Sequence, residues 1–253
     1  VDPTDIDDVI LGAAAQQGTQ QGNIARQSLL RAGLPTSVAG MSIDRQCASG
    51  MMAIATAAKQ IIDDGMNVTV GGGVESVSLV RNENFRMDNA RDPWLENEMP
   101  ELYMTMIETA ETVADRYGIS RERQDEYALQ SQMRTAHAQR NGFMDDEIVP
   151  LKSTMKYYDK ENKTATYHEV NLIKDEGNRP DTSLEGLSAL KPVFKDGIHI
   201  SEGSHITAGN ASQLSDGASA SILMESKEAE RRGLNPLGVY RGMAVAGCDP
   251  DEM

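Results

Sequence analysis

One helix that is apolar nearly all round constrains the fold of this chain more than any other segment. The pattern predicts this helix over residues 48–64, because Met, Ala and Ile occupy positions on every side of it. Gly65 ends the helix, and residues 37–43 and 67–71 on either side have the extended pattern of strands. A strand–helix–strand order predicts an α/β fold with this helix buried inside the molecule.

The rest of the chain contains a polar middle segment between further regular elements. Residues 81–101 are expected to form a loop-like insertion, and residues 152–180 are charged without clear periodicity. Further elements are expected as helices over 19–32, 106–117, 121–140 and 227–232, a buried strand over 219–224 and another strand over 238–245. The middle segment, 77–214, is therefore interpreted as a mainly helical subdomain inserted into an α/β domain made of 1–76 and 215–253.

Composition excludes several classes of function. The chain has 253 residues and a formal net charge of -15, which opposes binding to nucleic acid and to anionic membrane surfaces. It has no apolar run long enough for a membrane insertion and no secretory signal. With only two cysteines, a disulfide framework is not expected, and a reducing, cytoplasmic location is favoured. The first residue is not Met, so an upstream targeting segment stays open.

Cys47 is the candidate nucleophile. It lies where the expected strand passes through a short polar turn into the start of the apolar helix. Unpaired backbone N–H groups and the helix dipole favour a thiolate there, and the same N–H groups suit an oxyanion. The alternative is that Cys47 is a small buried apolar residue, and position alone does not decide between the two.

Three motifs follow one another along the chain: Arg45-Gln-Cys-Ala-Ser-Gly50, Gly71-Gly-Gly-Val-Glu-Ser76 and residues 206–218. Together they resemble motifs of the thiolase family. Arg45-Gln-Cys47-Ala-Ser-Gly50 is similar to the sequence around the acyl-carrying cysteine, and Gly71-Gly-Gly-Val-Glu75-Ser76 to the Gly-Gly-x-Glu-Ser that follows. Residues 206–218 resemble the segment that closes the family's inserted domain. The resemblance covers essentially the whole chain and implies a layered α/β domain with an inserted coenzyme A-binding loop domain. Ketoacyl synthases share the fold, but their cysteine lies in a different local sequence.

The resemblance also implies a reaction and its substrates. A thiolase transfers an acyl group between a cysteine and coenzyme A, either cleaving a 3-ketoacyl-CoA or condensing acetyl-CoA. Coenzyme A and acyl-CoA would be substrates, with no permanently bound cofactor and no metal site. The full-length protein would be a homodimer or homotetramer. Residues 182–187 and 212–217 look slightly more like those of degradative, broad-range enzymes.

Six further site residues follow from the resemblance, position by position. Ala208 and Ser212 would lie near the pantetheine arm and Arg179 beside the nucleotide. Leu190 and Phe194 would line the same groove, although both are equally suited to an ordinary core. Met106 would lie near the acyl pocket, with core as its alternative. Ile107 replaces the family's usual Gly and leaves acyl chain length open.

The family's second-half motifs do not occur in the sequence. These are Asn-Glu-Ala-Phe, the activating histidine of Gly-His-Pro, and a second cysteine in Cys-x-Gly; Cys248 precedes Asp-Pro and does not match. The expectation is a thiolase fragment, truncated at both ends and lacking the C-terminal domain, with little turnover alone. The alternatives are a non-catalytic coenzyme A-binding or scaffold protein of thiolase fold and, last, a lone-cysteine hydrolase or redox enzyme.

Overall fold

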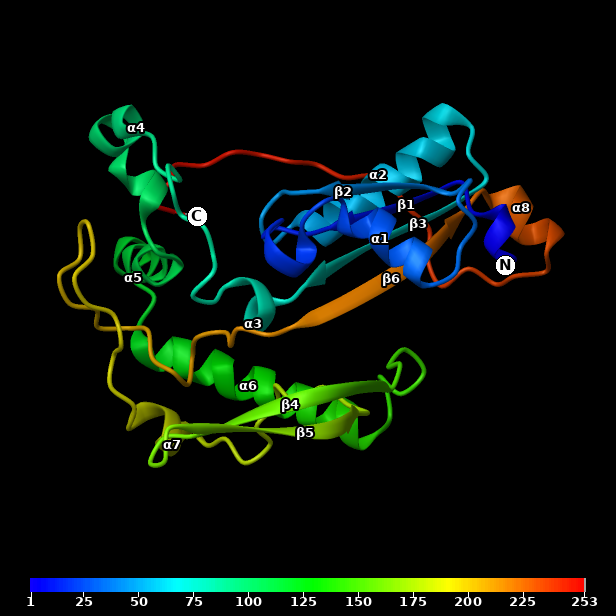
Figure 1. Cartoon of the computed structure of the whole chain (residues 1–253). Helices are drawn as coiled ribbons and strands as arrows, with labels where there is room; N and C mark the ends of the chain where they lie inside the picture. Colours follow the sequence, from blue (N-terminus) through cyan, green and yellow to red (C-terminus); the bar gives the residue numbers. More distant parts are fainter. Residues whose placement is uncertain (253) are drawn as a thin grey trace. The chain divides into compact units, whose positions relative to one another are not determined.

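The computed structural model describes residues 1–252 and divides the chain into two compact units (Figure 1). The first unit consists of residues 1–90 and 214–247, and the second of residues 91–213 with the end of the chain from Cys248. None of the helices in the described part is long and apolar enough to cross a membrane.

A four-stranded mixed sheet is the frame of the first unit. Its order is β2-β1-β3-β6, with β1 parallel to both β2 and β3, and β6 antiparallel to β3. The strands are β1 (Asp8–Gly12), β2 (Ala39–Ile43), β3 (Val68–Glu75) and β6 (Gly217–Met224). Every residue of β1 is buried, as expected for an inner parallel strand with both faces covered.

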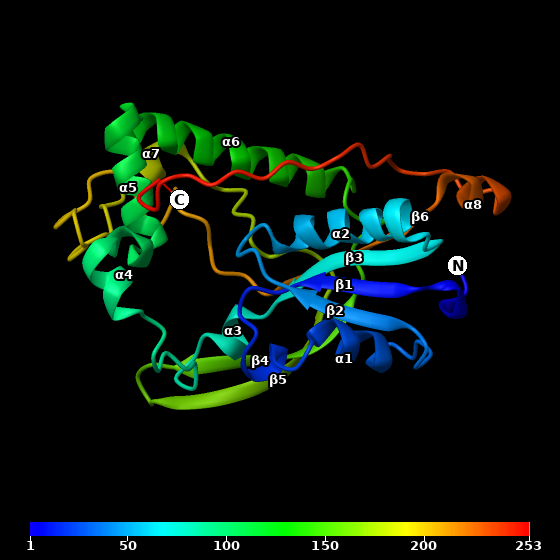
Figure 2. The same ribbon diagram turned by 90° about the horizontal axis from the view of Figure 1, so that it is seen from above.

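Helices α1 (Ile24–Arg31) and α2 (Ser49–Asp64) cover opposite faces of this sheet (Figure 2). Side chains of β1 alternate between the faces, so Val9 and Leu11 pack with Leu29 of α1, whereas Ile10 packs with Ala53 of α2. The unit also contains the short helices α3 (Val77–Val80) and α8 (Ser226–Arg231) and the 3₁₀ turns η1 (Pro3–Asp5) and η2 (Gly18–Gln20). The predicted α/β fold is confirmed.

The second unit combines helices with an exposed β-ribbon. Its elements are α4 (Pro93–Glu98), η3 (Pro100–Tyr103), α5 (Met106–Tyr117), α6 (Arg121–Arg140), β4 (Leu151–Asp159), β5 (Thr164–Leu172) and α7 (Leu184–Ser188). Thr105 and Ser120 cap α5 and α6, because each hydroxyl accepts a hydrogen bond from the backbone N–H three residues later. Strands β4 and β5 form an antiparallel pair.

Two expectations about burial were wrong. Helix α2 forms over the predicted residues, but Met51 and Ile62 are 70% and 65% exposed, so only one side of the helix is covered. Strand β6 also forms, at the edge of the described sheet beside β3, yet residues 217–222 are exposed. An apolar sequence pattern indicates which surfaces favour burial, but the described residues leave these surfaces uncovered.

Three expectations about regular structure were also wrong. No strand forms over residues 238–245, which have no neighbouring strand to pair with among the described residues. The ribbon β4–β5 forms in the segment where no periodicity was found. Most of its side chains are exposed on both faces, so its sequence has no clear alternation of apolar and polar residues. Helix α4 interrupts the expected loop; the sequence signal was Asp92 as N-cap followed by Pro93.

Candidate active site

Cys47 lies in the turn between β2 and α2, at the edge of the sheet where the parallel strands end. In the sheet register, Gly12 at the end of β1 pairs with Ile43 of β2 and Gly73 of β3. Ligands of open α/β sheets bind beyond this carboxyl edge. The turn therefore presents Cys47 at the edge where an α/β sheet commonly holds its substrate, and the thiol is exposed.

Two side chains hold the turn before Cys47. Ser49, which is 4% exposed, accepts a hydrogen bond from Arg45 N (2.8 Å) and donates one to Gln46 O (2.5 Å). Asp44 Oδ1 accepts from Gln46 N at 2.7 Å. Gln46 has a φ of 46°, a left-handed conformation that a residue other than glycine adopts only when its surroundings enforce it. The cysteine thus follows a backbone turn that is fixed from both sides.

The first part of α2 packs directly against the backbone of two glycines, Gly12 and Gly71. A Cβ added to Gly12 would lie 2.2 Å from the carbonyl carbon of Ser49, and one added to Gly71 would lie 2.7 Å from the Cα of Ile54. Only glycine permits these approaches, because any side chain would push the helix away from the sheet. The glycines of β1 and β3 therefore set the position of the helix that follows Cys47.

Glu75, at the end of β3, ties a second loop to the same edge. Its carboxylate accepts hydrogen bonds from Ala14 N (2.8 Å), Ala15 N (3.3 Å) and Gln20 Nε2 (2.6 Å). The Gln20 side-chain oxygen accepts from Ser76 N. The Glu-Ser of the second motif therefore secures the loop after β1, a structural role that the sequence did not reveal.

Asp216 connects the second motif with the third. Its carboxylate accepts hydrogen bonds from Ser78 N (2.9 Å), Ser78 Oγ and Ser76 Oγ (3.3 Å). Burial raises the pKa of this carboxyl, but the hydrogen bonds from Ser78 and Ser76 outweigh it and hold the pKa below its ordinary value. Residues far apart in the sequence thus meet where β3 ends and β6 begins.

In the second unit, helix α6 anchors the loops that carry the predicted coenzyme A residues. Gln132 Oε1 accepts from Arg179 N at 2.8 Å, which fixes the backbone of an exposed arginine. Gln213, next to the exposed Ser212, donates to Gly177 O at 3.1 Å and joins the two loops. The Arg179 and Ser212 segments therefore lie close together, which the sequence alone did not establish.

Helix α5 holds the loop before Ala208 with two buried carboxylates. Glu108 accepts from His199 N (2.6 Å) and Ile200 N (3.2 Å), and Glu111 accepts from the backbone N–H groups of residues 204–206 at 2.7–3.1 Å. Burial raises the pKa of Glu108, but the backbone N–H groups of residues 198–200 hold it below its ordinary value. Both glutamates were missed from sequence, since acidic residues on a helix usually face solvent.

Met106 and Phe194 differ in accessibility. Met106 is the first residue of α5 and is exposed, so its side chain is free to contact a ligand. Phe194 is buried, and its carbonyl accepts a hydrogen bond from Gly203 N at 3.0 Å. Its burial favours the core interpretation over direct contact with a ligand.

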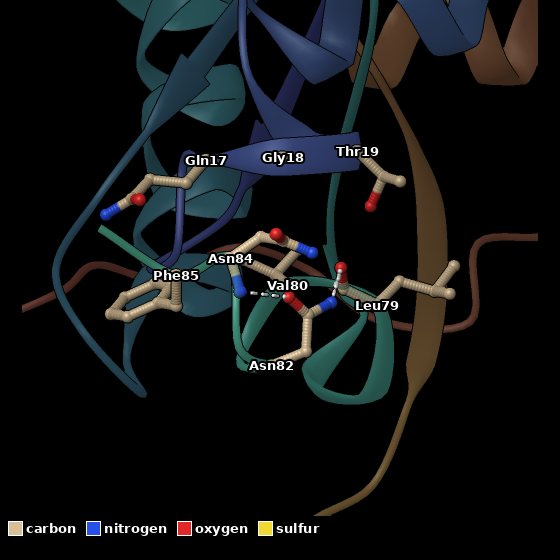
Figure 3. A pocket seen from close by; sticks show the side chains of 8 residues that line it. All are labelled: Gln17, Gly18, Thr19, Leu79, Val80, Asn82, Asn84 and Phe85. Carbon is tan, nitrogen blue, oxygen red and sulfur yellow. Dashed lines mark hydrogen bonds between the residues drawn. The ribbon is translucent and has the colours of Figure 1, made fainter.

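A hollow in the first unit is not lined by the turn that carries Cys47. It is lined by residues 17–19 and by residues of the 79–85 segment (Figure 3). Asn82 shapes one wall, because it donates to Leu79 O at 2.8 Å and accepts from Asn84 N at 2.9 Å. None of the predicted site residues lines this hollow. In the described part of the chain, no group of three or more His, Cys, Asp or Glu residues is placed to hold a metal ion.

Comparison with known proteins decides the family. The model described as "Thiolase, N-terminal domain" matches residues 1–227. The chain belongs to the thiolase family. The resemblance of its three motifs is thereby confirmed.

Relatives of this thiolase chain are similar over almost all of its length. It is 40% identical to the 3-ketoacyl-CoA thiolase of Bacillus subtilis (strain 168) over 251 residues, covering 98% of the chain and 61% of that relative. It is 40% identical to the peroxisomal 3-ketoacyl-CoA thiolase B of Mus musculus, covering 99% of the chain and 56% of that relative. The crystal structure of the Bacillus anthracis acetyl-CoA acetyltransferase is 40% identical with a TM-score of 0.73, covering 94% of this chain and 58% of that one.

The thiolase chain thus spans about three-fifths of the length of the relatives it matches. Of its predicted site residues, Cys47 lies in the first unit, and Met106, Arg179, Leu190, Phe194, Ala208 and Ser212 lie in the second. Each set is held by its own network of hydrogen bonds, and the roles of the individual residues remain predictions.

Proposed function

We propose that Cys47 carries the acyl group in a thiolase reaction. Its thiolate attacks the C3 carbonyl carbon of a 3-ketoacyl-CoA, the C2–C3 bond breaks, and the departing acetyl-CoA carbanion takes up a proton. The thiolate of a second coenzyme A then attacks the thioester and releases Cys47. The reverse sequence condenses acetyl-CoA with an acyl-Cys47.

The observation that carries this proposal is the fixed turn before an exposed thiol. Ser49 and Asp44 hold the backbone that leads into Cys47, and Gly12 lets the following helix approach the sheet. A nucleophile requires such a defined position, because small displacements of reacting atoms slow a reaction strongly. A merely structural cysteine would be expected in the core, whereas this thiol is accessible.

We further propose that the second unit binds coenzyme A. Its exposed Arg179 suits the phosphates or the adenine of the nucleotide end, and the small exposed residues Ala208 and Ser212 suit close passage of the pantetheine arm. Leu190 adds apolar contact, and Met106 adapts to the acyl chain. Phe194 supports this region from the core.

The remaining proposals concern the whole protein. Coenzyme A and acyl-CoA act as substrates without a permanently bound cofactor, and the protein functions in fatty acid metabolism. Degradative use with a broad range of chain lengths is favoured by residues 182–187 and 212–217. A homodimer or homotetramer and a cytoplasmic location complete the proposal; two exposed free thiols are compatible with a reducing compartment.

The test is exchange of the acyl group between acyl-CoA and free labelled coenzyme A, catalysed by the whole protein encoded by the gene. Cys47→Ala should abolish the exchange, whereas Cys248→Ala, which removes the second exposed thiol of the described residues, should leave it unchanged. Exchange that survives Cys47→Ala would refute the nucleophile. A protein that binds coenzyme A tightly but catalyses no exchange would favour a non-catalytic binding protein of the same fold.

A further inference from the structure

The N-terminal end of α6 carries a largely buried ion pair. Nε of Arg121 lies 3.0 Å and 2.9 Å from the two carboxylate oxygens of Asp125, and these side chains are 17% and 1% exposed. Removing two charges from water is costly, and their attraction offsets that cost only when further hydrogen bonds satisfy both groups. The partners of this pair therefore show what it holds in place.

The guanidinium of Arg121 binds the loop after α7. Its NH2 group donates to Leu187 O at 2.7 Å and to Leu190 O at 3.1 Å. Helix α7 lies beside the start of α6 (Figure 2), as these two bonds require. One planar guanidinium thus fixes the segment that carries Leu190.

The carboxylate of Asp125 binds a different loop. Its Oδ1 accepts from Asn210 Nδ2 at 3.0 Å, and Asn210 Oδ1 in turn accepts from Thr207 N at 2.8 Å. Thr207 is fully buried, whereas Ala208 beside it is exposed. The carboxylate therefore fixes the turn that presents Ala208.

The two loops also touch each other. A Cβ added to Gly209 would lie 2.6 Å from both the Leu187 Cδ2 and the Leu190 Cδ1 atoms. Because the ends of both leucine side chains lie directly on Gly209, a shift of either loop changes the space between Leu190 and Ala208. The ion pair of Arg121 and Asp125 holds both loops, so it also sets the distance between Leu190 and Ala208.

We propose that Arg121 and Asp125 are positioning residues for coenzyme A, which hold the Leu190 and Ala208 loops at the spacing that accepts the pantetheine arm. This inference rests on the proposed function, because it assumes that these loops bind coenzyme A. Neither side chain contacts the ligand itself. A lysine at position 121 keeps the charge but loses the planar set of donors that joins Asp125 and the two carbonyls.

The same helix offers a matched control. Arg123 and Glu126 form an ion pair at the same end of α6, with a 3.2 Å separation, but both side chains are exposed. Such surface pairs contribute little to stability and touch neither loop. Arg123→Lys therefore makes the same chemical change on the same helix without affecting the loops.

The experiment measures the coenzyme A affinity of the whole protein by calorimetry well below its melting temperature. Arg121→Lys should weaken binding about tenfold, the loss expected for charge-assisted hydrogen bonds, while Arg123→Lys should leave affinity unchanged. In the whole protein, Arg121→Lys should raise KM for coenzyme A and leave kcat unchanged. A general loss of structure would instead lower kcat as well.

The outcomes separate the two proposals. A wild-type whole protein that fails to bind coenzyme A would overturn both the proposed site and this inference. Binding by the wild type with unchanged affinity in Arg121→Lys would overturn the inference alone. Should Arg121→Lys fail to fold, Asn210→Ala decides the matter, because it cuts the Asp125 link and keeps the ion pair. Unchanged affinity in that variant would refute the positioning role, and weakened affinity would support it.

Discussion

The main helices of the two units make contacts of different kinds. In the first unit, α2 packs directly on the backbone of Gly12 and Gly71, while carboxylates such as Glu75 tie the neighbouring loops. In the second unit, buried charged side chains on α5 and α6 bind the backbone of the loops, as Glu111 and Arg121 do. Close backbone packing fixes a rigid nucleophile, whereas charged anchors arrange several loops around a larger surface. The first arrangement is vulnerable to added volume, and the second to lost charge.

The largest effect should come from adding one methyl group in the first unit. Gly12→Ala places a Cβ 2.2 Å from the Ser49 carbonyl carbon and should lower the free energy of unfolding by about 3 kcal/mol or more. Gly50→Ala is the matched control, since its Cβ would meet atoms only at 3.9 Å and beyond, and it should be neutral or stabilising by up to about 1 kcal/mol. Urea denaturation measures both. Equal stability of the two variants would contradict the close-packing account.

Removing one charge in the second unit should have the next largest effect. Glu111→Gln leaves the size almost unchanged, but its amide opposes the backbone N–H groups of residues 204–206, so unfolding should become easier by about 2 kcal/mol. Glu126→Gln, on an exposed side chain, should change stability by less than about 0.5 kcal/mol. Hydrogen exchange should show the loss of protection within residues 204–206. Full protection in Glu111→Gln would contradict the anchoring role.

A smaller effect is expected at the turn before Cys47. Ser49→Ala removes hydrogen bonds to Arg45 and Gln46 and should cost about 1 kcal/mol of stability. It should also slow alkylation of Cys47 in the folded chain relative to the urea-unfolded chain. Thr56→Ala removes the hydrogen bond from the Thr56 hydroxyl to Met52 O in the same helix and should leave the alkylation of Cys47 unchanged. Equal alkylation in both variants would show that Ser49 does not position the cysteine.

The pH dependence of stability should show the contribution of single carboxylates. The folded-state pKa of Glu108 is lowered, so its contribution is present above the unfolded pKa of about 4.3 and is lost as pH falls through the folded value. Glu108→Gln should therefore reduce the fall in stability below about pH 5. Asp216→Asn should do the same in the first unit, since its pKa is also lowered. An unchanged acid limb in Glu108→Gln would contradict this assignment.

The sequence predicted most of the regular structure around the site. The helices near 48–64, 106–117 and 121–140 are confirmed, and each has a recognisable cap or stop in the sequence. The cysteine turn was also located correctly between its strand and helix. The central strand β1 was not among the expected strands, since its three apolar residues, Val9 to Leu11, are a weak signal.

The contacts that arrange the site could not be predicted. The burial of Glu111 and Asp125 depends on loops more than eighty residues away in the sequence, so no local pattern reports it. The exposure of Met51 and of β6 depends equally on which surfaces meet. Sequence periodicity indicates which faces are apolar, but tertiary contacts decide which of them are covered.

The most direct test of the central claim is to locate the acyl group itself. The whole protein is mixed with acetyl-CoA, quenched in acid within one turnover and digested, and the peptides are mapped by mass spectrometry. The account predicts an acetyl thioester on Cys47 that disappears when free coenzyme A is added before the quench. Acetylation confined to Cys248, or no thioester at Cys47 in a protein that still transfers acetyl groups, would contradict it.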